Sequence, residues 1–216
     1  MIGQTISHNI VESEKPIIQK RKPLRLKEYN YSLEGSYFVT ICVKDREDLF
    51  GQIVSGALSL NQYGKIVQSC WNELPNHYSN ILLDEFVIMP NHVHGIITII
   101  DDVVGATFRR PNTNGAGRPR PYKKITLGNI VAFFKYQSTK RINEIRKTPG
   151  LSVWQRNYYD HIIRNEKSLY RIREYIITNP EQWTRDKENP MFQGVDEFEC
   201  WLNEEGEQKI NSRKIL

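Results

Sequence analysis

Two short apolar runs separated by a proline-containing turn constrain the fold of this chain more than any other feature. Residues 85–88 and 92–100 have the composition and length of buried strands. Between them lie Met89, Pro90 and Asn91, and a proline cannot donate a hydrogen bond to a β-ladder. We therefore expect a tight turn here, with the two strands pairing as neighbours in a sheet.

The remaining segments predict a mixture of strands and helices. Extended structure is expected where β-branched and aromatic residues gather, at 36–43, 49–54, 57–60 and 152–163. Helical spacing of apolar residues is found at 63–78, 126–145 and 166–179. Pro180 should end the last helix, because the residue before a proline disfavours α geometry. The order of elements predicts an α+β fold, a central antiparallel sheet with helices packed on one face.

Length and composition predict one folded domain. The chain has 216 residues, of which 39% are hydrophobic and 25% charged, values near those of globular proteins and unlike those of disordered or fibrous chains. We expect a domain at 29–185, preceded by a basic arm at 1–28 and followed by an acidic extension at 186–216. The apolar runs are too short to span a bilayer and no secretory signal pattern opens the chain, so we expect a cytoplasmic protein.

Charge is sorted along the chain. Residues 15–27 carry six cations and residues 103–143 carry nine, whereas all 25 acidic residues lie outside these two blocks. A solvated surface would explain either block alone. Two acid-free blocks in one chain favour a polyanionic partner.

His92 and His94 are candidate metal ligands. Residues two apart in a strand project from the same face, so both imidazoles can reach one ion while Val93 points to the opposite face. A mixed site completed by oxygen ligands suits manganese or magnesium. The alternative is a pair of hydrogen-bonded histidines without metal, and the two-residue spacing alone does not decide between them.

The segment from Phe86 to Ile97 resembles the HUH motif of the insertion-sequence-200-like transposases, most closely the REP-associated tyrosine transposases. Three further segments resemble that family in the same order, namely 25–43, 154–164 and 175–180. Together the matches cover about residues 21–185. The resemblance implies the HUH endonuclease arrangement, which is ferredoxin-like in its layers, for the predicted domain.

This resemblance implies a metal-dependent tyrosine transposase. Tyr175 would attack a DNA phosphodiester, form a 5′-phosphotyrosine bond and release a 3′-hydroxyl, and a second 3′-hydroxyl would later rejoin the strands. The metal, Mg²⁺ or Mn²⁺, would be held by His92, His94 and the amide oxygen of Asn179. Tyr175 and Asn179 lie four residues apart and therefore share a helix face. No nucleotide-binding motif is present, so no nucleotide cofactor is expected.

The implied substrate is single-stranded or hairpin DNA. Binding of such DNA combines cations that follow the backbone with aromatic faces for stacking. The expected DNA contacts are basic residues of the loop, the following helix and the extended segment: Arg109, Arg110, Arg118, Arg120, Lys123, Lys124, Lys135, Lys140 and Arg156.

The sequence is compatible with several alternatives. The chain could be a DNA-binding regulator of palindromic repeats that keeps the fold without the chemistry, or a nickase of the replication-initiator type. Tyr158, Tyr159 and Tyr170 compete with Tyr175 as nucleophile. Monomer and homodimer are both compatible with the resemblance.

Overall fold

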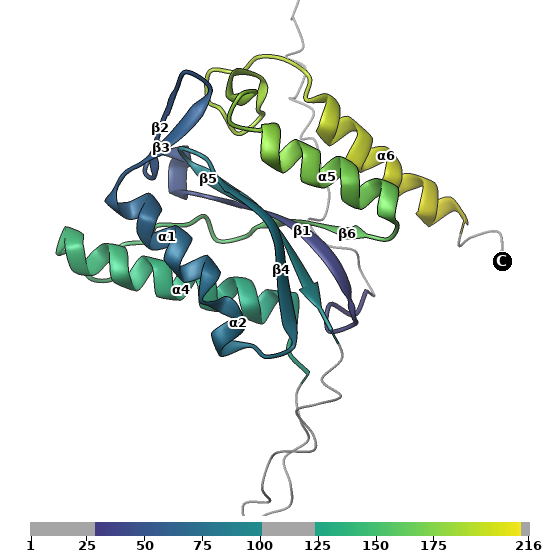
Figure 1. Ribbon diagram of the computed structural model, residues 1–216, viewed down its shortest axis with the longest axis horizontal. Coiled ribbons are helices and arrows are strands. Elements are labelled where there is room, and N and C mark those ends of the chain that lie inside the picture. The colour runs from purple at the N-terminus through teal and green to yellow at the C-terminus, as the bar shows by residue number, and fades with distance from the viewer. Residues whose placement is uncertain (1–28, 101–123, 213–216) are drawn as a thin grey trace, which may run out of the picture.

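The computed structural model describes residues 29–100 and 124–212, with side chains up to residue 205. Its centre is a four-stranded antiparallel sheet in the order β4-β5-β1-β6 (Figure 1). The strands are β1 (Gly35–Cys42), β4 (Ile81–Ile88), β5 (His92–Ile99) and β6 (Tyr159–Ile163). A separate hairpin is formed by β2 (Gly51–Val54) and β3 (Ala57–Leu60). The predicted α+β class and antiparallel sheet are confirmed, and the expected arm at 1–28 lies outside the described residues.

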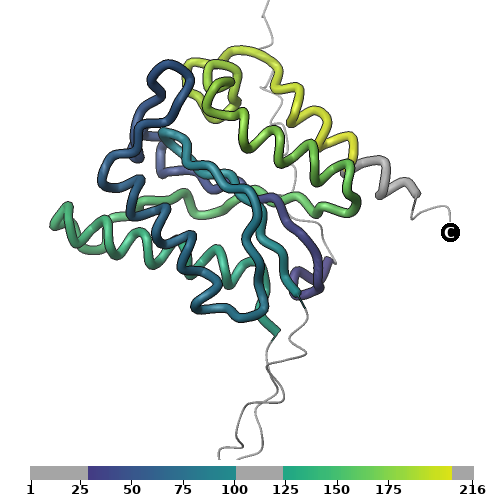
Figure 2. Tube along the Cα trace, viewed as in Figure 1, coloured from purple at the N-terminus to yellow at the C-terminus, as the bar shows by residue number. Residues whose placement is uncertain are grey.

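Helices cover both faces of the sheet, rather than one face as the sequence suggested. On one side lie α1 (Gln62–Asn72), α2 (Leu74–His77) and α4 (Leu127–Arg146). On the other lie α5 (Glu166–Thr178) and α6 (Glu197–Ser212), which run beside each other in the Cα trace of Figure 2. Short 3-10 turns, η1 (Lys44–Arg46) and η2 (Trp183–Arg185), complete the described elements.

The two hydrophobic clusters explain why both faces are covered. Successive side chains of a strand point to opposite faces. In β1, Tyr37 and Val39 belong to the cluster shared with α1 and α4, whereas Phe38 belongs to the cluster shared with α5 and α6. In β5, Val93 belongs to the first cluster and Ile96 to the second. The central strands are therefore apolar on both faces, and the histidines of β5 share the face of Ile96, toward α5.

Local signals set the ends of α5. Asn165 caps its first turn by accepting a hydrogen bond from the Ser168 amide. The helix ends at Thr178, one residue before the predicted end, and Pro180 follows in a turn, although Asn179 before the proline keeps α geometry. The helix expected at 63–78 is instead two helices, α1 and the short α2. Within the described ranges, no helix is long and apolar enough to cross a membrane.

Candidate metal centre and nucleophile

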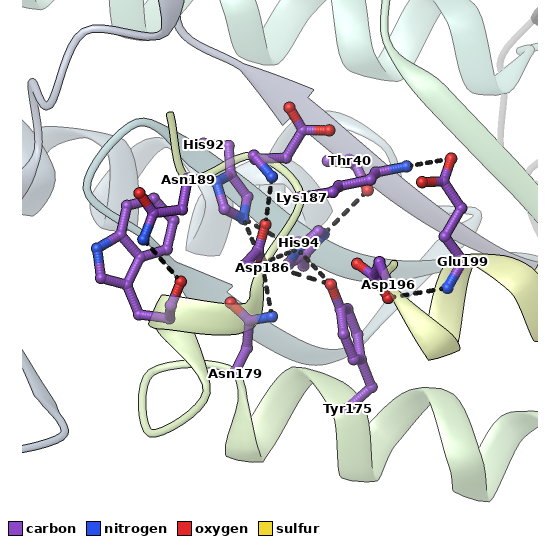
Figure 3. Close-up of polar contacts among 12 residues, drawn as sticks. Thr40, His92, His94, Tyr175, Asn179, Asp186, Lys187, Asn189, Asp196 and Glu199 are labelled. Carbon is purple, nitrogen blue, oxygen red and sulfur yellow. Dashed lines mark hydrogen bonds and ion pairs between the residues drawn. The ribbon is translucent and has the colours of Figure 1, made fainter. Parts of the chain in front are cut away.

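His92 and His94 meet at the start of β5, where the strand is fully covered. Their Nε2 atoms lie 2.9 Å apart, and each lies 3.6 Å from Oδ2 of Asp186 (Figure 3). All three side chains are buried. One donor atom from each lies within 4.8 Å of the other two, the spacing of a possible metal site. Two imidazole nitrogens and a carboxylate oxygen form a donor set that fits a divalent cation.

Asp186 reaches the histidines from the loop that follows η2. Its Oδ1 accepts a hydrogen bond from the Glu188 amide over 2.6 Å, and its Oδ2 accepts one from Nδ2 of Asn179 over 2.9 Å. Burial raises the pKa of the carboxyl. The hydrogen bond to His94 and the electrostatic attraction of both imidazoles outweigh that effect and hold the pKa well below its usual range. Asp186 is therefore ionised at neutral pH. Burial also lowers the pKa of His92 well below its usual value, so that ring is neutral and can offer a lone pair.

Tyr175 points from α5 toward the same place. Its hydroxyl lies 3.5 Å from Nε2 of His94 and 3.4 Å from Oδ2 of Asp186. Its ring stacks on Phe198 of α6, with centroids 3.6 Å apart and planes at 4°. Burial, followed by the charges of Asp186 and Asp196, raises the pKa of the Tyr175 phenol far above its ordinary value. The phenol is thus protonated in this conformation, and its attack on a phosphate would require transfer of that proton.

Asn179 lies one turn after Tyr175 and is buried. While its Nδ2 donates to Asp186, its Oδ1 is buried without a hydrogen-bond partner. Such an orphaned oxygen is uncommon in folded proteins, and water or a bound ion could serve as its partner. The oxygen and nitrogen of an amide are nearly indistinguishable in shape, so a half-turn of the amide would present oxygen to His92, His94 and Asp186, called here the metal-ligand cluster. The surroundings of Asn179 are therefore compatible with an additional oxygen ligand.

The four residues proposed from sequence for metal binding and catalysis come together, although Tyr175 and Asn179 lie on a different element from His92 and His94. Asp186 was not predicted. It is the first residue of the segment expected to be an acidic extension, and no local pattern distinguishes it from other acids. Only the packing of the 183–188 segment onto the sheet brings it to the histidines.

The predicted DNA contacts are distributed differently. Five of them, Arg109, Arg110, Arg118, Arg120 and Lys123, lie outside the described residues, and Lys124, Lys140 and Arg156 are exposed. Lys135 donates to the carbonyls of Gln155 and Asn157, so it joins α4 to that segment. Both α4 lysines belong to the layer opposite His92 and His94.

Arg156 lies nearer to the metal-ligand cluster along the sheet. The amide of its neighbour Gln155 donates to the carbonyl of Cys42, over 2.9 Å. Cys42 is the residue that pairs with His92 in the register between β1 and β5. Of the exposed predicted contacts, Arg156 is thus the one whose backbone adjoins the end of the sheet that carries the histidines.

Comparisons with known proteins give relatives of two kinds. No family model matches the chain. An uncharacterized protein of Haemophilus influenzae is 44% identical over 170 residues, covering 79% of this chain and 93% of that protein. A predicted REP-associated tyrosine transposase of the same organism is 24% identical over 159 residues, 70% of this chain and 73% of that one.

Two solved structures also match. One is a REP-associated tyrosine transposase bound to a REP hairpin, with a TM-score of 0.49, 18% identity and coverage of 76% of this chain and 77% of that chain. The other is a crystal structure of a predicted transposase from Deinococcus radiodurans, with a TM-score of 0.38, 14% identity and coverage of 71% and 95%.

Proposed function

We propose that this chain cleaves and rejoins DNA strands through Tyr175. It belongs to one family with the uncharacterized Haemophilus influenzae protein and is a distant homologue of the REP-associated tyrosine transposases. The substrate is single-stranded or hairpin DNA. A divalent metal ion, Mg²⁺ or Mn²⁺, is held by His92, His94 and Asp186, with Asn179 as a further oxygen ligand.

The observation that carries this proposal is the position of the Tyr175 hydroxyl. It lies within 3.5 Å of both a histidine nitrogen and the Asp186 carboxylate, which belong to segments far apart in the chain. The chain has eleven tyrosines. Tyr170, the other tyrosine of α5, is exposed and lies on a different face of the helix. This contrast between the two tyrosines of α5 supports Tyr175 as the nucleophile.

The reaction requires one bond exchange at phosphorus. The Tyr175 oxygen forms a bond to the phosphorus, the bond to the 3′ oxygen breaks, and that oxygen leaves as a 3′-hydroxyl after taking a proton. The phenolic proton would pass to water, because the pKa of Asp186 is held well below its usual range and its carboxylate is a weak base. A divalent ion held there would stabilise the negative charge on the phosphate oxygens. Because the phosphotyrosine ester conserves the energy of the broken phosphodiester bond, attack by a second 3′-hydroxyl can displace Tyr175 and rejoin DNA without a nucleotide cofactor.

Covalent trapping tests the proposal. The full-length protein is incubated with a labelled DNA hairpin carrying a single-stranded flank, in Mn²⁺ or Mg²⁺, and the products are separated under denaturing conditions. We expect a protein–DNA adduct that depends on metal and disappears in Tyr175→Phe. Tyr170→Phe is the matched control, since it removes a hydroxyl from the same helix, and it should retain the adduct. An undiminished adduct in Tyr175→Phe would reject the assignment.

A second candidate function is DNA binding without cleavage, as in a regulator of palindromic repeats. The stacking of Phe198 on the Tyr175 ring and the raised pKa of the phenol favour it, because both keep the nucleophile covered and protonated. Hairpin binding in a gel-shift assay, together with no adduct in Mn²⁺, Mg²⁺ or Co²⁺, would support this function over transposition.

A further inference from the structure

We propose that Asn91 is a positioning residue that determines which ring nitrogen of His92 carries the proton and also anchors the loop that carries Asp186. Asn91 is fully buried in the turn between β4 and β5 and lies outside the set of metal ligands. The inference deepens the proposed function, because it rests on His92 being a ligand.

The orientation of the Asn91 amide is determined by its neighbours. Its Nδ2 lies 2.8 Å from the carbonyl oxygen of Glu188 and 3.3 Å from that of Arg46. Carbonyl oxygens only accept hydrogen bonds, so the amide must turn its NH₂ group toward them. The opposite orientation would place three oxygens against one another in a buried site, where unpaired acceptors are costly.

This orientation directs the Asn91 oxygen at His92. Oδ1 of Asn91 lies 2.8 Å from Nδ1 of His92. Because Oδ1 can only accept, Nδ1 must carry the proton. In the neutral ring Nε2 then holds the lone pair, and Nε2 is the atom that faces His94 and Asp186. Asn91 therefore presents His92 as a ligand before any metal arrives. A second ring-nitrogen hydrogen bond of this kind commonly fixes metal-binding histidines.

His94 is held differently. Its Nδ1 lies 2.9 Å from the hydroxyl of Thr40, and a hydroxyl can either donate or accept. Thr40 can therefore accompany either tautomer of His94. The two histidines therefore differ. His92 has a fixed tautomer. Without metal, His94 can donate a hydrogen bond from Nε2 to Nε2 of His92, and when metal binds it can move its proton to Nδ1 and offer the lone pair of Nε2 to the ion.

The same amide anchors the Asp186 loop. The Glu188 carbonyl that accepts from Asn91 belongs to a residue whose own amide donates to Asp186 Oδ1 over 2.6 Å. The Glu188 side chain is buried and forms an ion pair with Arg46 at 2.8 Å. One buried residue of the β4–β5 turn thus touches both His92 and the loop of Asp186, so it joins two parts of the metal-ligand cluster that are distant in sequence.

The tautomer is tested first in the unaltered, metal-free protein. Long-range ¹H–¹⁵N NMR spectra of imidazoles distinguish a proton on Nδ1 from one on Nε2, and His92→Gln identifies the His92 signals among those of five histidines. We expect His92 with its proton on Nδ1. A His92 proton on Nε2 would overturn the inference. Because metal is absent, this result does not depend on the proposed catalytic function.

Two variants test the consequence for metal binding, measured as Mn²⁺ affinity by calorimetry on the full-length protein. Asn91→Leu removes both the acceptor and the donor, and we expect affinity to fall by roughly 10- to 100-fold with His92 shifting to the Nε2 tautomer. Asn91→Asp keeps an acceptor for Nδ1, so it should keep the tautomer while losing the bond to the Glu188 carbonyl. Asn143→Leu is the matched control, because Asn143 is a buried asparagine on α4 that donates to the Leu151 carbonyl.

The outcomes separate the two proposals. Wild-type affinity and tautomer in Asn91→Leu would overturn the positioning role, and so would an Nε2 tautomer in Asn91→Asp. If Asn91→Leu does not fold, the wild-type and Asn91→Asp spectra still decide the tautomer. Failure of the unaltered protein to bind Mn²⁺ would instead contradict the proposed function, whatever tautomer His92 adopts.

Discussion

Asn179 donates a hydrogen bond from Nδ2 to Oδ2 of Asp186 over 2.9 Å. This bond joins the end of the tyrosine helix α5 to the loop after η2, and it lies where both residues adjoin His92 and His94. The metal-ligand cluster is therefore assembled from the strand β5, the end of α5 and the following loop. A change in one of these segments should alter the position of groups in the others.

Asp186→Asn should weaken metal binding while preserving the fold. The substitution keeps the shape of the side chain but removes the charge that faces two imidazoles. We expect Mn²⁺ affinity to fall by at least about tenfold, and the covalent adduct to fall with it, as measured by calorimetry and the trapping assay. Glu181→Gln, an exposed acid of the same segment, is the control and should change neither. Unaltered affinity in Asp186→Asn would remove Asp186 from the ligand set.

Asn179 variants separate a ligand from a structural partner. Asn179→Leu removes the amide oxygen and the donor to Asp186, so Mn²⁺ affinity should fall by about tenfold. Asn179→Asp keeps an oxygen and adds negative charge, and it should bind Mn²⁺ at least as tightly as the unaltered protein. If Asn179→Leu binds Mn²⁺ normally, the amide oxygen is not a ligand and its only role is the hydrogen bond to Asp186.

Local sequence signals predicted much of the fold. The strand at 92–100 and the helix at 166–179 could be predicted because composition, the spacing of apolar residues and Pro180 act within a few residues. The two-faced packing was not predicted, although β5 is apolar on both sides, which is the pattern of a strand that is buried on both faces.

The candidate site divides in the same way. His92, His94, Tyr175 and Asn179 could be named because four segments of the chain resemble the transposase family, and strand and helix spacing is consistent with each pair sharing a face. Asp186 could not, since its position depends on the Glu188 amide, the Asn179 amide and the packing of the loop on β5. Lys135 lies in a basic block and was predicted to contact DNA. Its hydrogen bonds to two backbone carbonyls depend on tertiary packing and could not be predicted from the sequence.

The ion pair between Asp84 of β4 and Arg173 of α5 should make stability depend on pH. Arg173 donates to both carboxylate oxygens of Asp84, over 2.9 and 2.6 Å, and these bonds hold the pKa of the carboxyl below its usual value. A depressed carboxyl pKa stabilises the fold above the unfolded pKa of about 3.9, and this contribution is lost as pH falls through the folded pKa.

Asp84→Asn should therefore lower the melting temperature at pH 7 by roughly 2–4 °C, the effect of about 1 kcal/mol in a chain of this size, and by less at pH 3. Thermal unfolding followed by circular dichroism at both pH values measures the difference. Glu174→Gln, an exposed acid on the same helix, should leave the melting temperature unchanged at both. An equal loss at pH 7 and pH 3 would show that the charge of Asp84 is not responsible.

Trp71 occupies the space into which a side chain at Gly95, the residue after His94, would project. A Cβ at Gly95 would lie 2.6 Å from Cη2 of Trp71, whose ring stacks on Phe86 at 4.3 Å. Gly95→Ala should therefore destabilise the fold by about 1–3 kcal/mol, measured by urea unfolding. Adding Trp71→Phe makes room, so the double variant should lose less stability than the two single changes combined. Simple additivity would show that Trp71 is not the obstacle.

Salt dependence tests which basic residues contact DNA. Each phosphate contact adds to the slope of log affinity against log salt, so hairpin affinity should fall steeply between 50 and 200 mM salt. Arg156 is exposed beside the histidine end of the sheet, and Arg156→Ala should reduce the slope by about one without changing the melting temperature. Lys135 is hydrogen-bonded to the carbonyls of Gln155 and Asn157, so Lys135→Ala should lower the melting temperature and leave the slope nearly unchanged.

Filter binding at several salt concentrations measures the slopes. A flat salt response in the unaltered protein would remove the proposed role of the basic residues, and a slope change in Lys135→Ala alone would reverse the assignment of these two side chains.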